Sequence, residues 1–207
     1  MEKLKSSNAM SLKKEYGRLK KHHRGAIRTR LARLTIGSSV GRVLKKGSKE
    51  RIWHILEKIP VDEIIQLQSE QDYKKWFEKQ LGVLARKIDK TNKGNTRIYP
   101  GYKWGHATKI LCLYLRSVVI DREYFLQNYR EKVKYWLYCP IDSQVMSALK
   151  RCNVHLPFEK IKDIDTPEKF YAVQDRLKQA ASEAGVPRIW FDDNWGDRQW
   201  FIQSENS

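Results

Sequence analysis

The sequence has few cysteines, no long apolar run and a shortage of acidic residues. Its three cysteines, Cys112, Cys139 and Cys152, form no Cys-x-x-Cys pair, which disfavours a disulfide framework and a zinc ribbon. The longest apolar run, residues 110–115, is far shorter than the roughly 20 residues that a membrane-spanning helix needs. The N-terminus has no uncharged apolar stretch of the secretory type. We therefore expect a soluble, cytoplasmic, globular protein with no membrane partner.

Acidic residues are outnumbered, and the positive charge gathers near the N-terminus. The 207 residues contain 41 Lys and Arg against 24 Asp and Glu, a formal net charge of +17. Residues 1–51 hold 16 of those cations and only 3 Glu. Such a block typically binds a polyanion, because each neutralised phosphate releases condensed counterions. The candidate phosphate contacts in this segment are Lys20, Lys21, Arg24, Arg28 and Arg30.

Charge alone does not separate DNA, RNA and acidic lipid as partners of this segment. The Trp and Tyr residues dispersed over the rest of the chain favour nucleic acid, because bases need stacking partners. A solvated arm and a mitochondrial presequence are the alternatives. We therefore divide the chain into a basic DNA-binding segment, residues 1–51, and a helical domain, residues 52–207.

Apolar residues recur at helical spacing along most of the chain, whereas an extended stretch is suggested only at residues 188–191. Helices are expected at 48–58, 61–68, 70–89, from near 106 to 119, 121–136, 142–151 and 166–184. The last of these has Thr166 as its N-cap, Pro167 at the first position and Gly185 past its end. The sequence predicts an all-α fold without internal repeats.

The break before the fourth helix has the composition of a phosphate-binding turn. Residues 90–105, KTNKGNTRIYPGYKWG, contain three glycines and one proline between two helices, the layout of a helix-hairpin-helix element. Glycines let the backbone approach a phosphate, and the N–H groups of the next helix point at the anion. The candidate DNA contacts are Gly101, Tyr102, Lys103, Trp104, Gly105 and His106. A plain interhelical loop is the alternative.

Lys109 lies near the expected start of the strongly apolar fourth helix. Desolvation and the positive end of the helix dipole would both favour the neutral amine there. A neutral amine can attack a carbonyl-like carbon or a sugar C1′ atom. The alternative is a lysine that extends its charged end away from an apolar helix.

Asp142 follows Lys109 by 33 residues, in the sequence Tyr138-Cys139-Pro140-Ile141-Asp142. An aspartate at this position is an ordinary helix N-cap. A carboxylate beside a sugar would also stabilise the positive charge that develops as an N-glycosidic bond breaks. Both interpretations remain open from the sequence.

Taken together, the Pro-Gly…Gly turn, the lysine early in the next helix and the Pro-Ile-Asp sequence resemble the helix-hairpin-helix DNA glycosylases, over about residues 50–200. The long spacing from Lys109 to Asp142 is more similar to the archaeal 8-oxoguanine glycosylases than to the endonuclease III branch. Residues 185–195, GVPRIWFDDNW, are similar to the end of that group. The chain departs from the family in the longer turn between Gly101 and Gly105 and in the wider spacing from Gly105 to Lys109. Its basic N-terminus is also similar to bacterial antiphage glycosylases that remove modified cytosines.

The resemblance implies a DNA glycosylase that extrudes a modified or damaged base, either modified phage cytosine or 8-oxoguanine, and leaves an abasic site. Asp142 would stabilise the cationic sugar or orient a water, and Lys109 would attack C1′ and permit strand nicking. The base would lie against aromatic faces, for which the candidates are Trp136, Tyr138, Trp190 and Trp195. We expect a monomer that needs neither a cofactor nor a metal.

Three other functions are compatible with the sequence. The first is a non-catalytic helix-hairpin-helix protein that binds DNA or RNA. The second is a metal-dependent nuclease that uses Asp192, Asp193 and Asp197, although such carboxylates usually lie on a strand core that this chain lacks. The third is an accessory protein that binds a protein partner. His155 and the Asp192-Asp193 pair fit exposed charge and turn chemistry better than metal ligation.

Overall fold

The computed structural model describes residues 24–36, 44–91, 103–121, 124–151, 154, 156, 158 and 163–195. Every regular element in these ranges is helical, which confirms the predicted all-α class. A helix at residues 24–35 is followed by α2 (Ser48–Glu57), η2 (Val61–Gln66), α3 (Glu70–Thr91), α4 (Lys103–Arg116), η3 (Ser117–Asp121), α5 (Gln127–Val133), α6 (Ser143–Arg151), α7 (Pro167–Glu183) and η5 (Arg188–Trp195).

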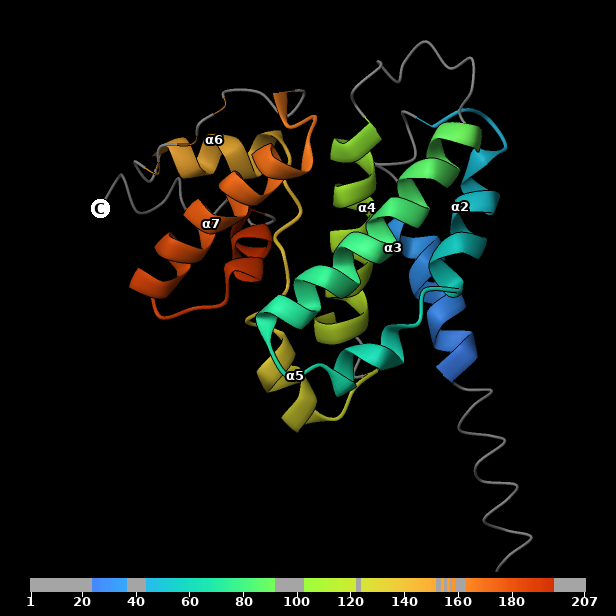
Figure 1. Cartoon of the computed structure of the whole chain (residues 1–207), viewed down its shortest axis with the longest axis horizontal. Helices are drawn as coiled ribbons and strands as arrows, with labels where there is room; N and C mark the ends of the chain where they lie inside the picture. Colours follow the sequence, from blue (N-terminus) through green and yellow to red (C-terminus); the bar gives the residue numbers. More distant parts are fainter. Residues whose placement is uncertain are drawn as a thin grey trace, which may run out of the picture.

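Helix α4 lies between two groups of helices (Figure 1). The helix at residues 24–35 and α2 lie on one side, and α3 crosses α4 diagonally and packs against it. On the other side, α6 and α7 pack against η5. The short helix α5 lies below α4 in the view of Figure 1, and the chain runs from it to α6 past α4. This arrangement brings the start of α6 next to α4.

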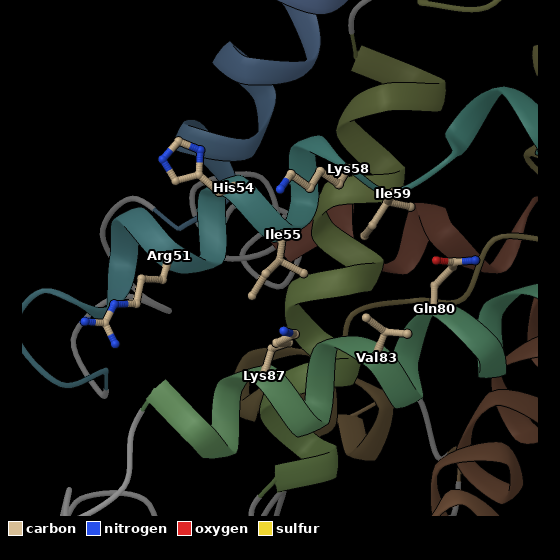
Figure 2. Close-up of a pocket in the computed structure, with 8 residues that line it drawn as sticks. All are labelled: Arg51, His54, Ile55, Lys58, Ile59, Gln80, Val83 and Lys87. Carbon is tan, nitrogen blue, oxygen red and sulfur yellow. The ribbon is translucent and has the colours of Figure 1, made fainter.

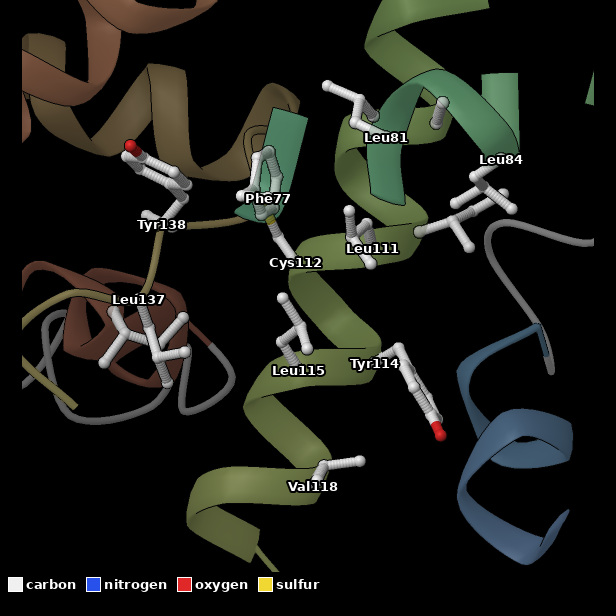
Figure 3. Packing of buried hydrophobic residues seen from close by; sticks show 14 of the residues in the cluster. Phe77, Leu81, Leu84, Leu111, Cys112, Tyr114, Leu115, Val118, Leu137 and Tyr138 are labelled. Carbon is white, nitrogen blue, oxygen red and sulfur yellow. The ribbon is translucent and has the colours of Figure 1, made fainter. Parts of the chain in front are cut away.

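The core forms because α4 is apolar on most of its surface. Its Ile110, Leu111 and Leu115 are fully or almost fully buried, and Figure 3 shows Leu111 near Phe77 and Leu81 of α3, with Leu115 one turn further along α4. Burying each such side chain contributes about 1.5–3 kcal/mol. The hydrophobic packing thus fixes α4 against α3.

Tyr138 extends this core toward α7. Its ring centroid lies 4.8 Å from that of Phe77 in an edge-to-face arrangement and 5.5 Å from that of Phe170. Such aromatic pairs are worth about 0.5–1.5 kcal/mol beyond their buried area. The aromatic cluster therefore anchors the chain four residues before Asp142.

Residues 24–36 pack onto the core, although they belong to the basic segment. Leu31, Ala32 and Ile36 are buried, with exposures of 2% or less. At its start, Arg24 Nη1 lies 3.7 Å from Asp62 Oδ1, and the Tyr124 hydroxyl donates to Asp62 Oδ2 at 3.2 Å. The expected boundary at residue 51 lies inside α2, so the charge distribution does not mark a structural boundary there.

The ends of several helices differ from those that the sequence predicts. Helix α4 begins at Lys103 and continues as the π-helical η3 to Asp121, so α5 is confined to Gln127–Val133 rather than 121–136. Residues 188–191 form part of the 3₁₀ helix η5, and the expected extended stretch is wrong. The predicted ends of α7 are confirmed: the Thr166 hydroxyl accepts from the Lys169 N–H at 3.4 Å, and Gly185 has a φ of +67°.

Candidate functional site

The fold brings Lys109 and Asp142 into contact. Lys109 Nζ of α4 lies 3.2 Å from Asp142 Oδ2, directly before α6. Their side chains are 22% and 26% exposed, so both groups are shielded but can be reached from solvent. The two residues that the sequence singled out for chemistry thus form one amine–carboxylate pair.

Asp142 is also the N-cap of α6. Its Oδ1 accepts hydrogen bonds from the N–H groups of Gln144 at 2.9 Å and Val145 at 3.0 Å, while Oδ2 accepts from Lys109. The cap interpretation is therefore confirmed, and it is compatible with a chemical role. Three hydrogen bonds fix the carboxylate, and two of them come from the positive end of α6.

The chain before Asp142 is fixed by a side chain from α7. Gln174 is fully buried; its Oε1 accepts from the Cys139 N–H at 3.0 Å, and its Nε2 donates to the Cys139 carbonyl at 2.8 Å. Because both backbone groups of Cys139 are satisfied, this non-helical segment can be buried there without leaving an unpaired backbone donor or acceptor at Cys139. Gln174 is not among the residues expected at the site, although a glutamine among Phe170, Val173 and Leu177 on the buried face of a helix is a recognisable signal.

Arg188 fixes the same segment from η5. Its Nε donates to the Leu137 carbonyl at 2.9 Å, and its Nη2 donates to the Trp136 carbonyl at 2.7 Å. Nη2 also lies 2.9 Å from Glu70 Oε1 of α3, which neutralises the buried guanidinium. Arg188 is only 2% exposed, and nothing in the sequence identified it.

Lys109 lies beyond the first turn of its helix, contrary to expectation. The sequence predicts a helix that begins near His106, but α4 begins three residues earlier, at Lys103. The field of a helix terminus falls off within the first turn, so the dipole of α4 contributes little at Lys109.

A second ion pair lies further along α4. Arg116 Nη1 lies 2.8 Å from Asp192 Oδ2 of η5. Arg116 follows Lys109 by seven residues, which places it on the same side of α4, about 10 Å along the axis. Asp192, a candidate metal ligand in the nuclease alternative, therefore has a cationic partner. The described residues contain no group of three His, Cys, Asp or Glu side chains that could hold a metal ion.

Two cysteines close to these pairs are not suited to nucleophilic chemistry. Cys112 and Cys139 are both buried free thiols. Burial raises the pKa of both thiols well above the ordinary value, and the negative charge of Asp192 raises each further. Both therefore remain protonated, and only a thiolate is a good nucleophile.

The expected hairpin residues divide into two groups. Gly101 and Tyr102 lie outside the described residues, as does the side chain of Lys103. Trp104, Gly105 and His106 belong to the first turn of α4 rather than to a loop, and His106 is buried. A Cβ atom at Gly105 would lie 3.4 Å from the Ile164 carbonyl oxygen, so the first turn of α4 lies beside the chain before α7.

The basic contacts near the N-terminus also divide. Lys20 and Lys21 lie outside the described residues. Arg24 is paired with Asp62, and its guanidinium lies 5.6 Å from the Tyr124 ring centroid. Arg28 is half-buried, whereas Arg30 is exposed. Of these residues, Arg30 retains the exposure that a phosphate contact needs.

The aromatic residues expected around the base occupy different environments. Tyr138 is 4% exposed and belongs to the core, so its ring is not available to a ligand. Trp136 is half-buried, and Lys132 Nζ lies 5.0 Å from its ring centroid. Trp190 is 41% exposed. The side chain of Trp195 lies outside the described residues.

A groove with a cationic rim lies between α2 and α3 (Figure 2). Its volume is about 480 Å³, and Arg51, Lys58 and Lys87 contribute the cations. Ile55, Ile59 and Val83 provide its apolar lining. Neither Lys109 nor Asp142 lines this groove, so its cationic surface is separate from the amine–carboxylate pair.

No family model, curated protein or solved structure matches this chain. Among the described helices, none combines the length and apolarity needed to cross a bilayer. Function is therefore inferred from the residues of the chain and their geometry.

Proposed function

We propose that the chain is a DNA glycosylase that acts on an extruded modified or damaged base, with Lys109 and Asp142 as its catalytic residues. The observation that carries the proposal is the 3.2 Å distance between Lys109 Nζ and Asp142 Oδ2. By their resemblance to helix-hairpin-helix glycosylases, these two residues would be the catalytic ones, and the contact brings them together. The net charge of +17 further supports a nucleic-acid substrate.

In this mechanism, Asp142 stabilises the charge that develops on the sugar. When the bond between C1′ and the base nitrogen breaks, the electron pair leaves with the base and the sugar becomes cationic. The Asp142 carboxylate is already fixed by the Gln144 and Val145 amides, so it needs little reorganisation to face that charge.

Lys109 provides the nucleophile once it has lost a proton. The Asp142 carboxylate lies within hydrogen-bonding distance and can accept that proton. Nζ then forms a bond to C1′ while the bond to the base breaks, and the departing base takes the electron pair and the proton that Asp142 had accepted. Asp142 is thereby an anion again as positive charge develops on the sugar. Opening of the sugar ring gives a protonated Schiff base, from which β-elimination nicks the strand or water regenerates the amine. If water attacks C1′ instead, the product is an intact abasic site.

The test measures base release from duplexes that carry 8-oxoguanine, uracil, hydroxymethylcytosine, glucosylated hydroxymethylcytosine or an alkylated base. We expect release from at least one duplex and its loss in Asp142→Asn. Borohydride should trap a covalent complex in the wild type but not in Lys109→Gln, because the trapped bond is the imine. Lys150→Gln is the matched control, since it removes an exposed lysine on α6 and should leave release unchanged.

The alternatives give different results in the same assay. Release without trapping would identify a monofunctional enzyme in which water attacks C1′. Salt-sensitive DNA binding without release from any duplex would favour the non-catalytic binding protein, in which the 3.2 Å pair only joins α4 to α6. Loss of activity with a chelator would favour the metal-dependent nuclease.

A further inference from the structure

Two exposed aromatic rings flank one lysine on the surface between α5 and η5. Tyr135 is 51% exposed and Trp190 is 41% exposed, although their chain positions are far apart. Lys134 Nζ lies 5.3 Å from the Tyr135 ring centroid and 5.8 Å from the Trp190 ring centroid. These distances fall within the range of cation–π contacts, so the ammonium helps to hold both rings at the surface.

We propose that Tyr135, Lys134 and Trp190 form a stacking platform for unpaired nucleotides of the DNA strand. The proposal rests on the proposed function, because it takes DNA as the ligand, and it adds a surface outside the Lys109–Asp142 pair. Aromatic rings stack on any base, since every base has a π-face, and neighbouring cations attract the phosphates.

The charges around the platform favour nucleic acid over a protein partner. Lys134 pairs with Glu131, the only acidic residue of α5. Arg130 and Lys132 lie in the same helix, and Lys132 approaches the half-buried Trp136. Residues 127–134 carry a net charge of +2, while Asp192 and Asp193 of η5 are balanced by Arg188 and by Arg116, the partner of Asp192. The chain as a whole is also cationic. A surface of exposed rings and excess cations is complementary to bases and phosphates.

The two rings are held in position before any ligand binds. Arg188, two residues before Trp190, donates to the backbone carbonyls of Trp136 and Leu137, directly after Tyr135. This buried contact fixes the turn after α5 relative to η5, and a preorganised surface loses less entropy on binding. The chain continues from Tyr135 to Asp142 in seven residues, so the platform and the carboxylate belong to one anchored segment.

The experiment measures the affinity of the full-length protein for a fluorescein-labelled single-stranded dT oligonucleotide of about 12 nucleotides by anisotropy. Tyr135→Ala and Trp190→Ala should each weaken binding about 5- to 100-fold, the range expected for the loss of one stacked base. Trp190→Phe keeps a ring and should retain most of the affinity. Leu126→Ala removes an exposed apolar side chain without a ring and should have no effect.

Tryptophan fluorescence provides a second signal that a general loss of charge or stability would not produce. Binding of the oligonucleotide should quench the emission of the wild-type protein. Trp190→Phe should lose most of this quenching while it still binds, because the reporting indole is absent. Thermal unfolding by circular dichroism should show that all four variants fold, since the substituted side chains are exposed.

The platform and the proposed reaction can fail separately. If no duplex releases a base but the two alanine variants lose oligonucleotide affinity, the platform stands and the glycosylase proposal fails. If base is released but these variants bind the oligonucleotide like the wild type, the platform is wrong. The platform is also wrong if the two alanine variants lose as much affinity for a fully paired duplex as for the single-stranded oligonucleotide. It is likewise wrong if the wild-type protein shows no detectable affinity for the oligonucleotide at low salt. Either result would favour a protein-binding surface.

Discussion

Gln174 satisfies both backbone hydrogen-bonding groups of Cys139: its Oε1 accepts from the N–H at 3.0 Å, and its Nε2 donates to the carbonyl at 2.8 Å. This contact spans 35 residues and joins α7 to the non-helical segment that ends at Asp142. It thereby links the stability of the fold to the position of a proposed catalytic group.

Replacing Gln174 should destabilise the protein. Methionine has a volume similar to that of glutamine, but Gln174→Met leaves the buried N–H and carbonyl of Cys139 without partners. Each unsatisfied group costs about 1–3 kcal/mol of stability. We expect the free energy of unfolding to fall by about 2–4 kcal/mol in a urea titration. Gln179→Met, an exposed position on the same helix, should change it by less than about 0.5 kcal/mol. Equal effects of the two substitutions would contradict the importance of the Cys139 contact.

Replacing Arg188 should lower the free energy of unfolding about as much as replacing Gln174, because it disrupts a buried charged network. Arg188→Met removes the donors to Trp136 and Leu137 and one partner of Glu70, which still lies beside Lys178. Breaking a buried charged network typically costs about 3–5 kcal/mol, and the remaining lysine should place the loss at the lower end. Chemical denaturation checks this value, with the exposed Arg176→Met as the control. A loss below about 1 kcal/mol would mean that water satisfies the two carbonyls equally well.

Two substitutions of Asp142 should separate its structural role from its chemical role. Both substitutions lose the ion pair with Lys109, but Asp142→Asn retains an oxygen that can accept from the Gln144 and Val145 amides. Asp142→Ala should therefore cost about 1 kcal/mol more stability than Asp142→Asn. Both substitutions remove the negative charge and should abolish base release. Thermal melts and the release assay, run on the same preparations, test the two effects. Normal release by Asp142→Asn would show that the residue is only a cap.

The buried tyrosines predict a loss of stability at alkaline pH. Burial, followed by the nearby negative charge of Asp62, raises the pKa of Tyr124 to about 12. An unfolded tyrosine ionises near pH 10, so the unfolded state releases its proton first and the free energy of unfolding falls as the pH rises from 10 to 12. Burial also raises the phenol pKa of four other tyrosines, so their ionisation lowers stability at alkaline pH in the same way: Tyr73, Tyr114, Tyr138 and Tyr171.

The change in melting temperature between pH 9 and pH 12 measures this effect. Tyr124→Phe removes one of the shifted groups and should make the decline shallower, although it loses the hydrogen bond to Asp62 at every pH. A parallel decline in the variant and the wild type would show that Tyr124 titrates normally in the folded protein.

Local signals predicted some elements and not others. The ends of α7 were predictable because Thr166, Pro167 and Gly185 act within a few residues of themselves. The prediction of an extended stretch at residues 188–191 is wrong because buried Ile189 beside exposed Trp190 fits both an alternating pattern and a short 3₁₀ turn. The predicted helix at residues 121–136 is longer than α5 because apolar residues continue on either side of Gln127–Val133.

The sequence identifies the residues of the candidate site but does not show that they lie in contact. Lys109 and Asp142 stood out individually, one for its apolar helix and the other for its position before a helix. Their 3.2 Å contact depends on tertiary packing. Gln174 and Arg188 were missed because their partners lie 35 and 51 residues away and are backbone groups, which any residue provides.

Because residues 24–36 pack into the core, the basic segment cannot be deleted without disturbing the fold. A deletion that removed all the cations before residue 52 would also remove Leu31, Ala32 and Ile36 from the interior, so lost DNA affinity in such a fragment would report misfolding as much as lost charge. Charge reversal of outward-facing Arg30 is the cleaner way to test the electrostatic contribution. Among related sequences, the inward positions of this helix should remain apolar, whereas the outward positions should vary in identity but remain cationic overall.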